Sequence, residues 1–317
     1  MIKLGFQVLN AGPLATPDRA IEVARRAETL GYESIVVTDH LVIPRHPTSR
    51  YPYNEAGRLF VPPDADYLEA LTMLSFLAGA TRTIRLGPSV LVLPYRNPVL
   101  TAKMLATLDV LSGGRLFVGV GVGWLREEFE LMGAPPFERR GEVADEWLDI
   151  FRRLWTEPDP TFEGRFYRFA DMGCFPKPVQ KPHPPIFVGG NTRPAIRRAA
   201  RYGQSWHAIR MRVEELRPRL DDLRAQLRVH GRPDDACGLS VRYGVRIVGP
   251  SGDVDRRAFE EPGRVFVGTV AQVVEQLKPV VALGPTHAIF DCRAGSHAEV
   301  LETMERLAGE VWPALVR

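Results

Sequence analysis

The 317-residue sequence predicts an α/β protein with the fold of a (β/α)8 TIM barrel. Eight short apolar runs rich in β-branched residues recur along the chain, and segments with helical periodicity separate them. Strands that alternate with helices pair in parallel through right-handed crossovers. Because no change in composition divides the eight units, we expect a single barrel domain over residues 1–317 rather than an open doubly wound sheet.

The expected elements follow one another in regular order. The predicted strands cover residues 2–8, 34–39, 84–93, 115–123, 185–190, 204–209, 240–248 and 287–292. The first helix should start after Thr16 as N-cap, carry Pro17 in its first turn and stop at Gly31. The later helices should begin near Tyr67, Asn97, Arg139, Thr192, Val213, Thr269 and Ser296.

Three connections are longer than the usual two to six residues, namely 41–66, 157–183 and 249–268. The first is rich in Pro, Tyr and Arg and is expected to form a lid or pocket wall at the C-terminal face of the barrel. The second contains FEGRFYRF, whose alternation is typical of a small hairpin.

Composition excludes several classes of protein. With 45% hydrophobic and 25% charged residues and no apolar run long enough to span a bilayer, the chain is expected to be cytoplasmic and not bound to membranes. Its net charge is +3, and its arginines are interspersed with acids, which disfavours nucleic acid as a partner. Cys174, Cys237 and Cys292 form no CxxC pair, so neither disulfides nor a structural zinc site is expected.

Reacting groups of such barrels lie at the carboxyl ends of the strands. The second predicted strand, ESIVVTDH, ends on Asp39 and His40, although an acid and an imidazole gain nothing from core packing. This ending indicates a functional site. Alternatively, Asp39 caps the next segment and His40 is a half-buried, hydrogen-bonded imidazole.

The third and fourth predicted strands are also unusual. Pro88 cannot donate to a sheet ladder, so within a strand it indicates a bulge, unless it lies at the strand entrance. Gly119, Gly121 and Gly123 recur at period two and leave one strand face without side chains. Such a face admits a flat ligand, or else the glycines only fit the taper of the barrel. The spacing is not that of a Rossmann fingerprint.

The fifth predicted strand runs through Gly189, Gly190, Asn191 and Thr192 directly into a helix. Backbone N–H groups at a helix N-terminus favour phosphate oxygens. Together with the glycines of the neighbouring strand, this turn indicates a planar ring joined to a phosphate.

The seven histidines form no HxH or HxxxH pair and GxSxG is missing, so neither a bound metal nor a serine hydrolase is expected.

Four segments, at residues 37–44, 84–130, 185–208 and 267–284, resemble the luciferase-like monooxygenase superfamily. Its members bind flavin mononucleotide (FMN) or the deazaflavin coenzyme F420 in a (β/α)8 barrel. The run at 84–130 is most similar to the actinobacterial branch that uses the deazaflavin. The resemblance therefore implies coenzyme F420 as cofactor, with FMN as the alternative.

The resemblance also implies roles for individual residues. His40 would be the catalytic proton donor or acceptor beside the ring. A non-prolyl cis peptide would lie near Ser89 and Val90. Residues implied to bind the cofactor are Asp39, Ser89, Val90, Gly121, Gly123, Gly189, Gly190, Asn191, Thr192 and Trp206.

Two positions depart from the family pattern. Many relatives have Asp-Gly-Trp where this chain has Gln204, Ser205 and Trp206, so no acidic contribution is expected there. Some relatives that oxidise a sugar phosphate carry a proton-donating Glu where this chain has Trp124, and that role is not carried over.

The leading hypothesis is a coenzyme F420-dependent oxidoreductase that transfers a hydride between the deazaflavin and a small organic substrate. One alternative is an FMN-dependent two-component monooxygenase supplied by a separate reductase. The other is a non-catalytic flavin-binding protein. The resemblance implies a homodimer.

Overall fold

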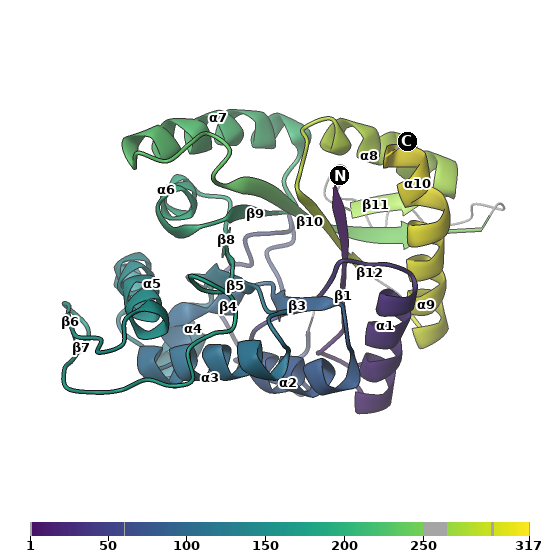
Figure 1. Cartoon of the computed structure of the whole chain (residues 1–317). Coiled ribbons are helices and arrows are strands. Elements are labelled where there is room, and N and C mark those ends of the chain that lie inside the picture. The colour runs from purple at the N-terminus through teal and green to yellow at the C-terminus, as the bar shows by residue number, and fades with distance from the viewer. Residues whose placement is uncertain (1, 60, 250–264, 293–294, 317) are drawn as a thin grey trace. The chain divides into compact units, whose positions relative to one another are not determined.

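The computed structural model describes residues 2–59, 61–249, 265–292 and 295–316. The chain divides into two compact units. Unit 1 comprises Met1–Leu9, Thr16–Val36 and Phe187–Arg317, and unit 2 comprises Asn10–Ala15 and Val37–Ile186. Figure 1 labels the elements of both units, which are described one at a time.

A parallel sheet forms the centre of unit 1. Its strands follow in the order β2-β1-β12-β10-β9-β8, with β11 beside β10. The bounds are β1 Lys3–Gln7, β2 Ser34–Val37, β8 Ile186–Gly189, β9 Ser205–Ile209, β10 Gly238–Ile247, β11 Val265–Gly268 and β12 His287–Cys292. Six of these strands were predicted from the sequence. The additional strand, β11, lies in the predicted connection at 249–268, of which residues 250–264 are outside the described residues.

Helices follow the strands of unit 1 in the alternating order that the sequence predicts. They are α1 Pro17–Thr29, α6 Arg193–Tyr202, α7 Val213–Val229, α8 Val270–Val281, α9 His297–Arg306, a π-helical turn Leu307–Val311 and α10 Trp312–Val316. Thr269 and Ser296, near which helices were predicted to begin, are N-caps, and each accepts a hydrogen bond from the third residue of its helix. Thr16 precedes α1, and Gly31, with φ of 78°, follows its end. Figure 1 shows α1 beside α9.

Unit 2 contains the middle of the chain. Its strands are β3 Arg85–Pro88, β4 Leu91–Val92 and β5 Val118–Gly121, and β4 pairs in parallel with β5. Its helices are α2 Ala70–Ala80, a 3-10 turn Leu93–Tyr95, α3 Pro98–Leu111, α4 Arg126–Leu131, a 3-10 turn Phe137–Arg139 and α5 Arg140–Thr156. The strand predicted at 84–93 is thus interrupted, and α2 begins three residues after the predicted Tyr67.

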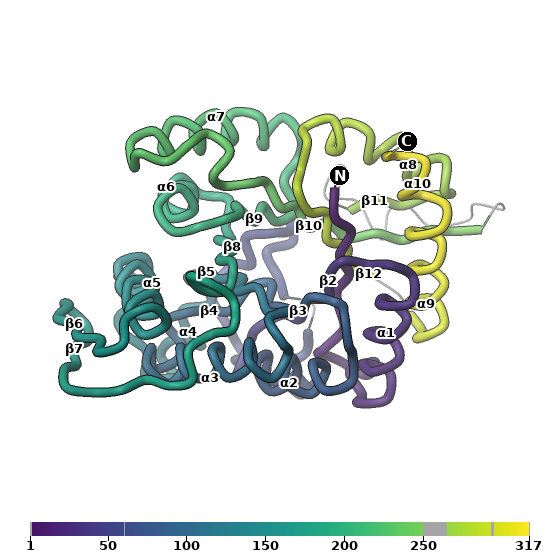
Figure 2. Tube along the Cα trace, viewed as in Figure 1, coloured from purple at the N-terminus to yellow at the C-terminus, as the bar shows by residue number. Residues whose placement is uncertain are grey.

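The long connections of unit 2 also match their predictions in part. The connection at 41–66 follows the carboxyl end of β2, and its described residues, 41–59 and 61–66, contain no helix or strand. After α5 the chain forms the predicted small hairpin, β6 Phe162–Glu163 and β7 Arg168–Phe169, which Figure 2 traces. Within the described ranges, no helix is both long and apolar enough to cross a membrane.

Candidate active site

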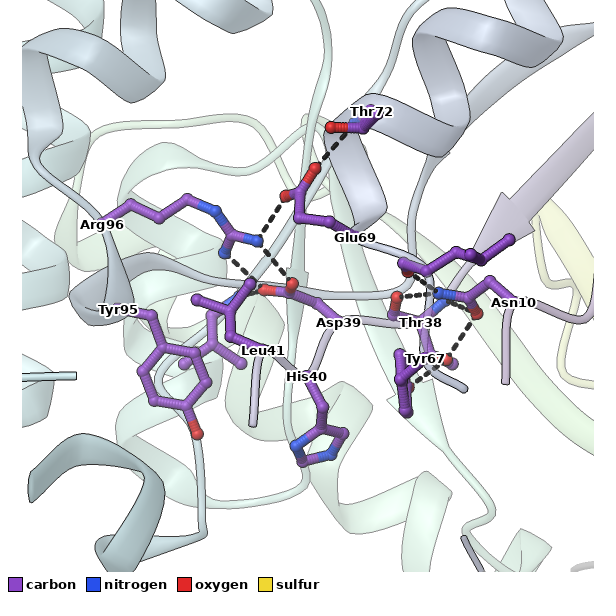
Figure 3. A network of polar contacts seen from close by, with 12 residues as sticks. Asn10, Thr38, Asp39, His40, Leu41, Tyr67, Glu69, Thr72, Tyr95 and Arg96 are labelled. Carbon is purple, nitrogen blue, oxygen red and sulfur yellow. Dashed lines mark hydrogen bonds and ion pairs between the residues drawn. The ribbon is translucent and has the colours of Figure 1, made fainter. Parts of the chain in front are cut away.

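Asp39 and His40 follow β2 in unit 2, and their side chains point in different directions (Figure 3). The Asp39 carboxylate accepts a hydrogen bond of 2.8 Å from the backbone N–H of Val92, which ends β4. It also accepts hydrogen bonds of 2.8 and 2.7 Å from the two terminal nitrogens of Arg96. Asp39 therefore fastens the segment after β2 to the segment after β4.

Arg96 connects this ion pair to helix α2. Its Nη2 donates at 2.6 Å to Glu69, the N-cap residue of α2, which in turn accepts from the Thr72 N–H. Burial acts to raise the pKa of Glu69, but the hydrogen bonds from Thr72 and the charge of Arg96 lower it overall. Glu69 thus remains ionised within the network of Figure 3.

His40 points away from this network toward helix α4. Its Nδ1 lies 2.7 Å from Oε2 of Glu128, whose side chain has no exposed surface. The same Oε2 accepts a 2.8 Å hydrogen bond from the Tyr95 hydroxyl. The other carboxylate oxygen, Oε1, accepts from the backbone N–H groups of Leu41 at 2.6 Å and Val42 at 3.2 Å.

Four donors therefore surround the Glu128 carboxylate. Burial acts to raise the pKa of Glu128, but the hydrogen bonds and charge from His40 and the N–H of Leu41 outweigh it, so the pKa is lowered. Burial, followed by the charge of Glu128, raises the pKa of Tyr95 well above its usual range, so its hydroxyl remains a donor. Glu128 was not predicted as a site residue. The motif REEFE reads as a solvated charged face, and α4 is only six residues long.

Aromatic rings from separate segments lie next to the imidazole. The rings of Tyr67 and Trp124 approach that of His40 edge to face, with centroids at 5.6 and 6.0 Å. Tyr51 contacts Trp124 in the same way at 5.2 Å. Trp124, which replaces the Glu of some relatives, thus contributes a half-buried apolar wall rather than a proton donor.

The interruption between β3 and β4 lies at the predicted position, where the Ser89–Val90 peptide bond is cis. The Ser89 N–H donates to the Val37 carbonyl of β2 at 2.8 Å. The non-prolyl cis peptide that the family resemblance implies near Ser89 and Val90 is thus confirmed.

Atoms of the neighbouring strand and of α4 approach the glycines of β5 and Gly123 closely, which agrees with the alternative that these glycines fit the barrel packing. A Cβ at Gly119 would collide with the carbonyl oxygen of Pro88, and one at Gly121 would lie 2.6 Å from Cγ2 of Val90. Gly123 has a φ of 79°, and a Cβ there would lie 2.7 Å from the Phe129 ring. Protein atoms therefore lie where Cβ atoms at these three positions would be placed. A role of Gly121 and Gly123 toward a cofactor would have to come from their backbone.

In unit 1, the predicted phosphate turn is fixed to the adjacent strand β9. Asn191 Nδ2 donates to the Ile209 carbonyl at 2.7 Å, and Asn191 Oδ1 accepts from the Ile209 N–H at 3.1 Å. The buried indole of Trp206 donates to the Gly190 carbonyl at 2.9 Å. Gly190 has a φ of 122°, and the turn leads through Thr192 into α6.

Unit 1 also contains a buried ion pair that was not predicted. Arg210, which follows β9 and has a φ of 50°, donates at 2.8 and 3.1 Å to the carboxylate of Asp291 in β12. The sequence signal for this ion pair was the charged residue near the carboxyl end of β9 and of β12. Asp39 and His40 give the same kind of signal after β2.

The predicted site residues thus fall into two groups. Unit 2 holds Asp39, His40, Ser89, Val90, Gly121 and Gly123, and unit 1 holds Gly189, Gly190, Asn191 and Thr192 of the phosphate turn together with Trp206. Among residues 2–59, 61–249, 265–292 and 295–316, no three His, Cys, Asp or Glu side chains are arranged to hold a metal ion.

The fold and this site define an α/β barrel protein with a buried imidazole–carboxylate pair after its second strand. Residues 3–261 match the family described as luciferase-like monooxygenase. The chain is 34% identical over 218 residues to an FMNH2-dependent dimethylsulfone monooxygenase of Pseudomonas putida, a match covering 68% of this chain and 56% of that protein. The first curated relatives are matched over 56% to 62% of their length.

Two solved structures cover the whole fold. An F420-dependent secondary alcohol dehydrogenase in complex with an F420–acetone adduct aligns with a TM-score of 0.81 at 18% identity, over 100% of this chain and 99% of that one. A monooxygenase from Streptomyces bottropensis aligns with a TM-score of 0.77 at 22% identity, over 98% and 99% of the two chains. The predicted (β/α)8 barrel is confirmed. The chain belongs to the luciferase-like monooxygenase family.

Proposed function

We propose that the protein is a coenzyme F420-dependent oxidoreductase that acts on a small organic substrate. The observation that carries the proposal is the buried His40, which is held through Nδ1 by Glu128. Its Nε2 is then the ring atom that exchanges a proton with a ligand. The similarity of residues 84–130 to the deazaflavin-using branch supports coenzyme F420 as the cofactor.

The phosphate turn of unit 1 fits a phosphorylated cofactor. Helix geometry leaves the first N–H groups of α6 without intrahelical acceptors, and Gly190 adopts a φ that side chains rarely allow. The side-chain amide of Asn191 is engaged by Ile209, so phosphate would be held by backbone N–H groups. When bound, the deazaflavin would supply two-electron hydride chemistry.

In this proposal the protein contributes position, water exclusion and a proton. Trp124 and Tyr67 restrict access of water to the His40 ring. His40 Nε2 donates or accepts the proton that accompanies hydride transfer, depending on its direction.

A second candidate is an FMN-dependent monooxygenase that receives reduced flavin from a separate reductase. Its support is the 34% identity to the FMNH2-dependent enzyme of Pseudomonas putida. A third, non-catalytic flavin binding, would retain the cofactor site without turnover.

Titration of the purified protein with coenzyme F420 and, separately, with FMN tests the proposal through quenching of cofactor fluorescence. We expect saturable binding of the deazaflavin at micromolar concentration. Tight FMN binding with none of the deazaflavin would overturn the assignment. Oxygenation of a substrate with reduced FMN and oxygen would then support the second candidate, and binding without turnover would support the third.

We also propose that residues 1–317 act as one domain and associate as a homodimer. Large apolar side chains are exposed on α2 and α3, where Phe76 is 45% and Leu111 68% exposed. Light scattering after size-exclusion chromatography should give twice the chain mass, and Leu111→Glu should shift the population toward monomer. A monomeric wild-type protein would contradict the proposal.

A further inference from the structure

We propose that Glu128 is the positioning residue of the site: it fixes His40 in the tautomer that carries hydrogen on Nδ1, so that Nε2 is the proton-exchanging atom. The inference rests on the proposed function for the use of that proton. It concerns a residue on a short helix, α4, that the sequence pattern did not single out.

The hydrogen-bond inventory of the carboxylate decides the tautomer. An ionised Glu can only accept hydrogen bonds, so every group around it must donate. Because Nδ1 of His40 lies 2.7 Å from Oε2, it must carry the hydrogen. In the neutral ring, Nε2 then has a lone pair that accepts a proton, and in the imidazolium ion it has a proton to donate.

The state of Glu128 does not depend on His40 alone. Tyr95 and the N–H groups of Leu41 and Val42 supply three further donors to the same carboxylate. These donors favour the ionised form, and the lowered pKa of Glu128 agrees. The carboxylate therefore remains an acceptor while His40 gains and loses its proton.

The position of the carboxylate is fixed by apolar packing. Phe129, the next residue of α4, packs edge to face on Tyr95 with ring centroids 4.9 Å apart. Val92, Tyr95 and Phe129 form a buried apolar cluster on which Leu41 also packs. The helix residue next to Glu128 and the residue that follows His40 are thus packed on the same buried apolar cluster.

The two carboxylate oxygens of Glu128 have different partners, so the effect of replacing Glu128 by Gln on the His40 tautomer can be predicted. The single amide oxygen of Gln is required by the N–H groups of Leu41 and Val42, which donate to Oε1. The amide NH2 then faces Nδ1 of His40, which must accept instead of donate. The hydrogen of the neutral ring moves to Nε2, and the atom that accepted a proton no longer does so.

The test is ¹⁵N NMR of the histidine rings in the protein without cofactor, with the His40 signals identified by their loss in His40→Gln. We expect a protonated Nδ1 and an unprotonated Nε2 for neutral His40, and the opposite pattern in Glu128→Gln. Glu130→Gln changes an exposed residue of the same helix and should leave the pattern unaltered. Tyr95→Phe removes one donor but keeps the carboxylate, so it should also preserve the tautomer.

Steady-state turnover provides the second readout. Glu128→Gln should lower kcat by up to about a hundredfold, the loss expected for removal of the imidazole itself, with unchanged cofactor affinity, because the imidazole is then held in the wrong tautomer. A wild-type spectrum with hydrogen on Nε2 and none on Nδ1 would overturn the inference, as would an unchanged tautomer in folded Glu128→Gln. Absence of wild-type turnover with either cofactor would instead contradict the proposed function, while the spectra would still decide the role of Glu128.

Discussion

The carboxylate of Asp39 and the guanidinium of Arg96 form a two-point ion pair, with nitrogen–oxygen distances of 2.8 and 2.7 Å. The Asp39 side chain has no exposed surface and that of Arg96 is 11% exposed. Both charges are largely removed from water, so removal of either partner would leave the other as a buried charge without full compensation, which costs stability. This geometry gives Asp39 a structural role through Val92 and Arg96, which are distant in sequence, rather than as a cap of the segment that follows it. Its role toward a cofactor stays a prediction.

Asp39→Asn should lower the free energy of unfolding by about 3 kcal/mol, since Arg96 would lose its fully buried two-point partner and keep the partly exposed Glu69 carboxylate. Chemical denaturation measures the loss, and Asp64→Asn at an exposed position should change stability by less than about 0.5 kcal/mol. If Asp39→Asn kept its stability but lost cofactor affinity, Asp39 would be primarily a ligand-binding residue.

Gly119→Ala should destabilise the protein by about 3 kcal/mol or be incompatible with folding, because its Cβ would collide with the backbone carbonyl of Pro88. Gly79→Ala provides the matched control. Gly79 lies in α2 with no atoms near its Cβ position, so this change should stabilise by about 0.5–1 kcal/mol. Thermal melting of both variants checks the pair. Equal effects would contradict the close approach of the two strands.

His40→Ala should reduce turnover on the order of a hundredfold through loss of the proton donor or acceptor. Cofactor affinity should change little. His46→Ala removes an exposed imidazole from the connection at 41–66 and should leave turnover intact. Comparable turnover in His40→Ala and wild-type protein would remove His40 from the mechanism.

Asn191→Ala should weaken cofactor binding about tenfold, because the phosphate turn would no longer be fixed to Ile209 and would have to be ordered on binding. Trp206→Phe, which removes the hydrogen bond to Gly190, should have an effect in the same direction. Equilibrium titration with the cofactor measures both. Wild-type affinity in the two variants would argue against phosphate binding at this turn.

Acidification should loosen the connection at 41–66. Burial acts to raise the pKa of Glu127, but hydrogen bonds from Thr48 and Ser49 outweigh it and lower the pKa from 4.5 to about 2. A carboxyl group whose pKa is lower in the folded protein stabilises fully above its unfolded value, so this contribution is lost between about pH 4.5 and pH 2. The protection factor of the Thr48 amide, which corrects the exchange rate for its intrinsic pH dependence, should fall in that window, and Glu127→Gln should abolish the fall. A protection factor that stays constant in the wild type would contradict this account.

Local patterns in the sequence were sufficient for most of the fold. A strand lies at each of the eight predicted positions, and caps such as Asn97 and Ser296 follow from side-chain chemistry that acts within a few residues, but β11 was missed and the strand at 84–93 is divided in two. The bulge at Ser89 and Val90 was signalled by Pro88 and by the family resemblance.

Contacts between distant residues could not be predicted in the same way. Glu128 is 88 residues from His40, and nothing in REEFE distinguishes its buried carboxylate from the exposed Glu130. The glycines of β5 were recognised as unusual, but their reason lies in the approach of Pro88 and Val90 from another strand.

Adjacent residues of α4 fasten two places in the chain after β2. Glu128 binds the N–H groups of Leu41 and Val42, and Glu127 binds Thr48 and Ser49. Residues 43–47 therefore form a short loop whose two ends are both hydrogen-bonded to α4. We therefore expect changes in the length and composition of residues 43–47 to leave the imidazole of His40 in place.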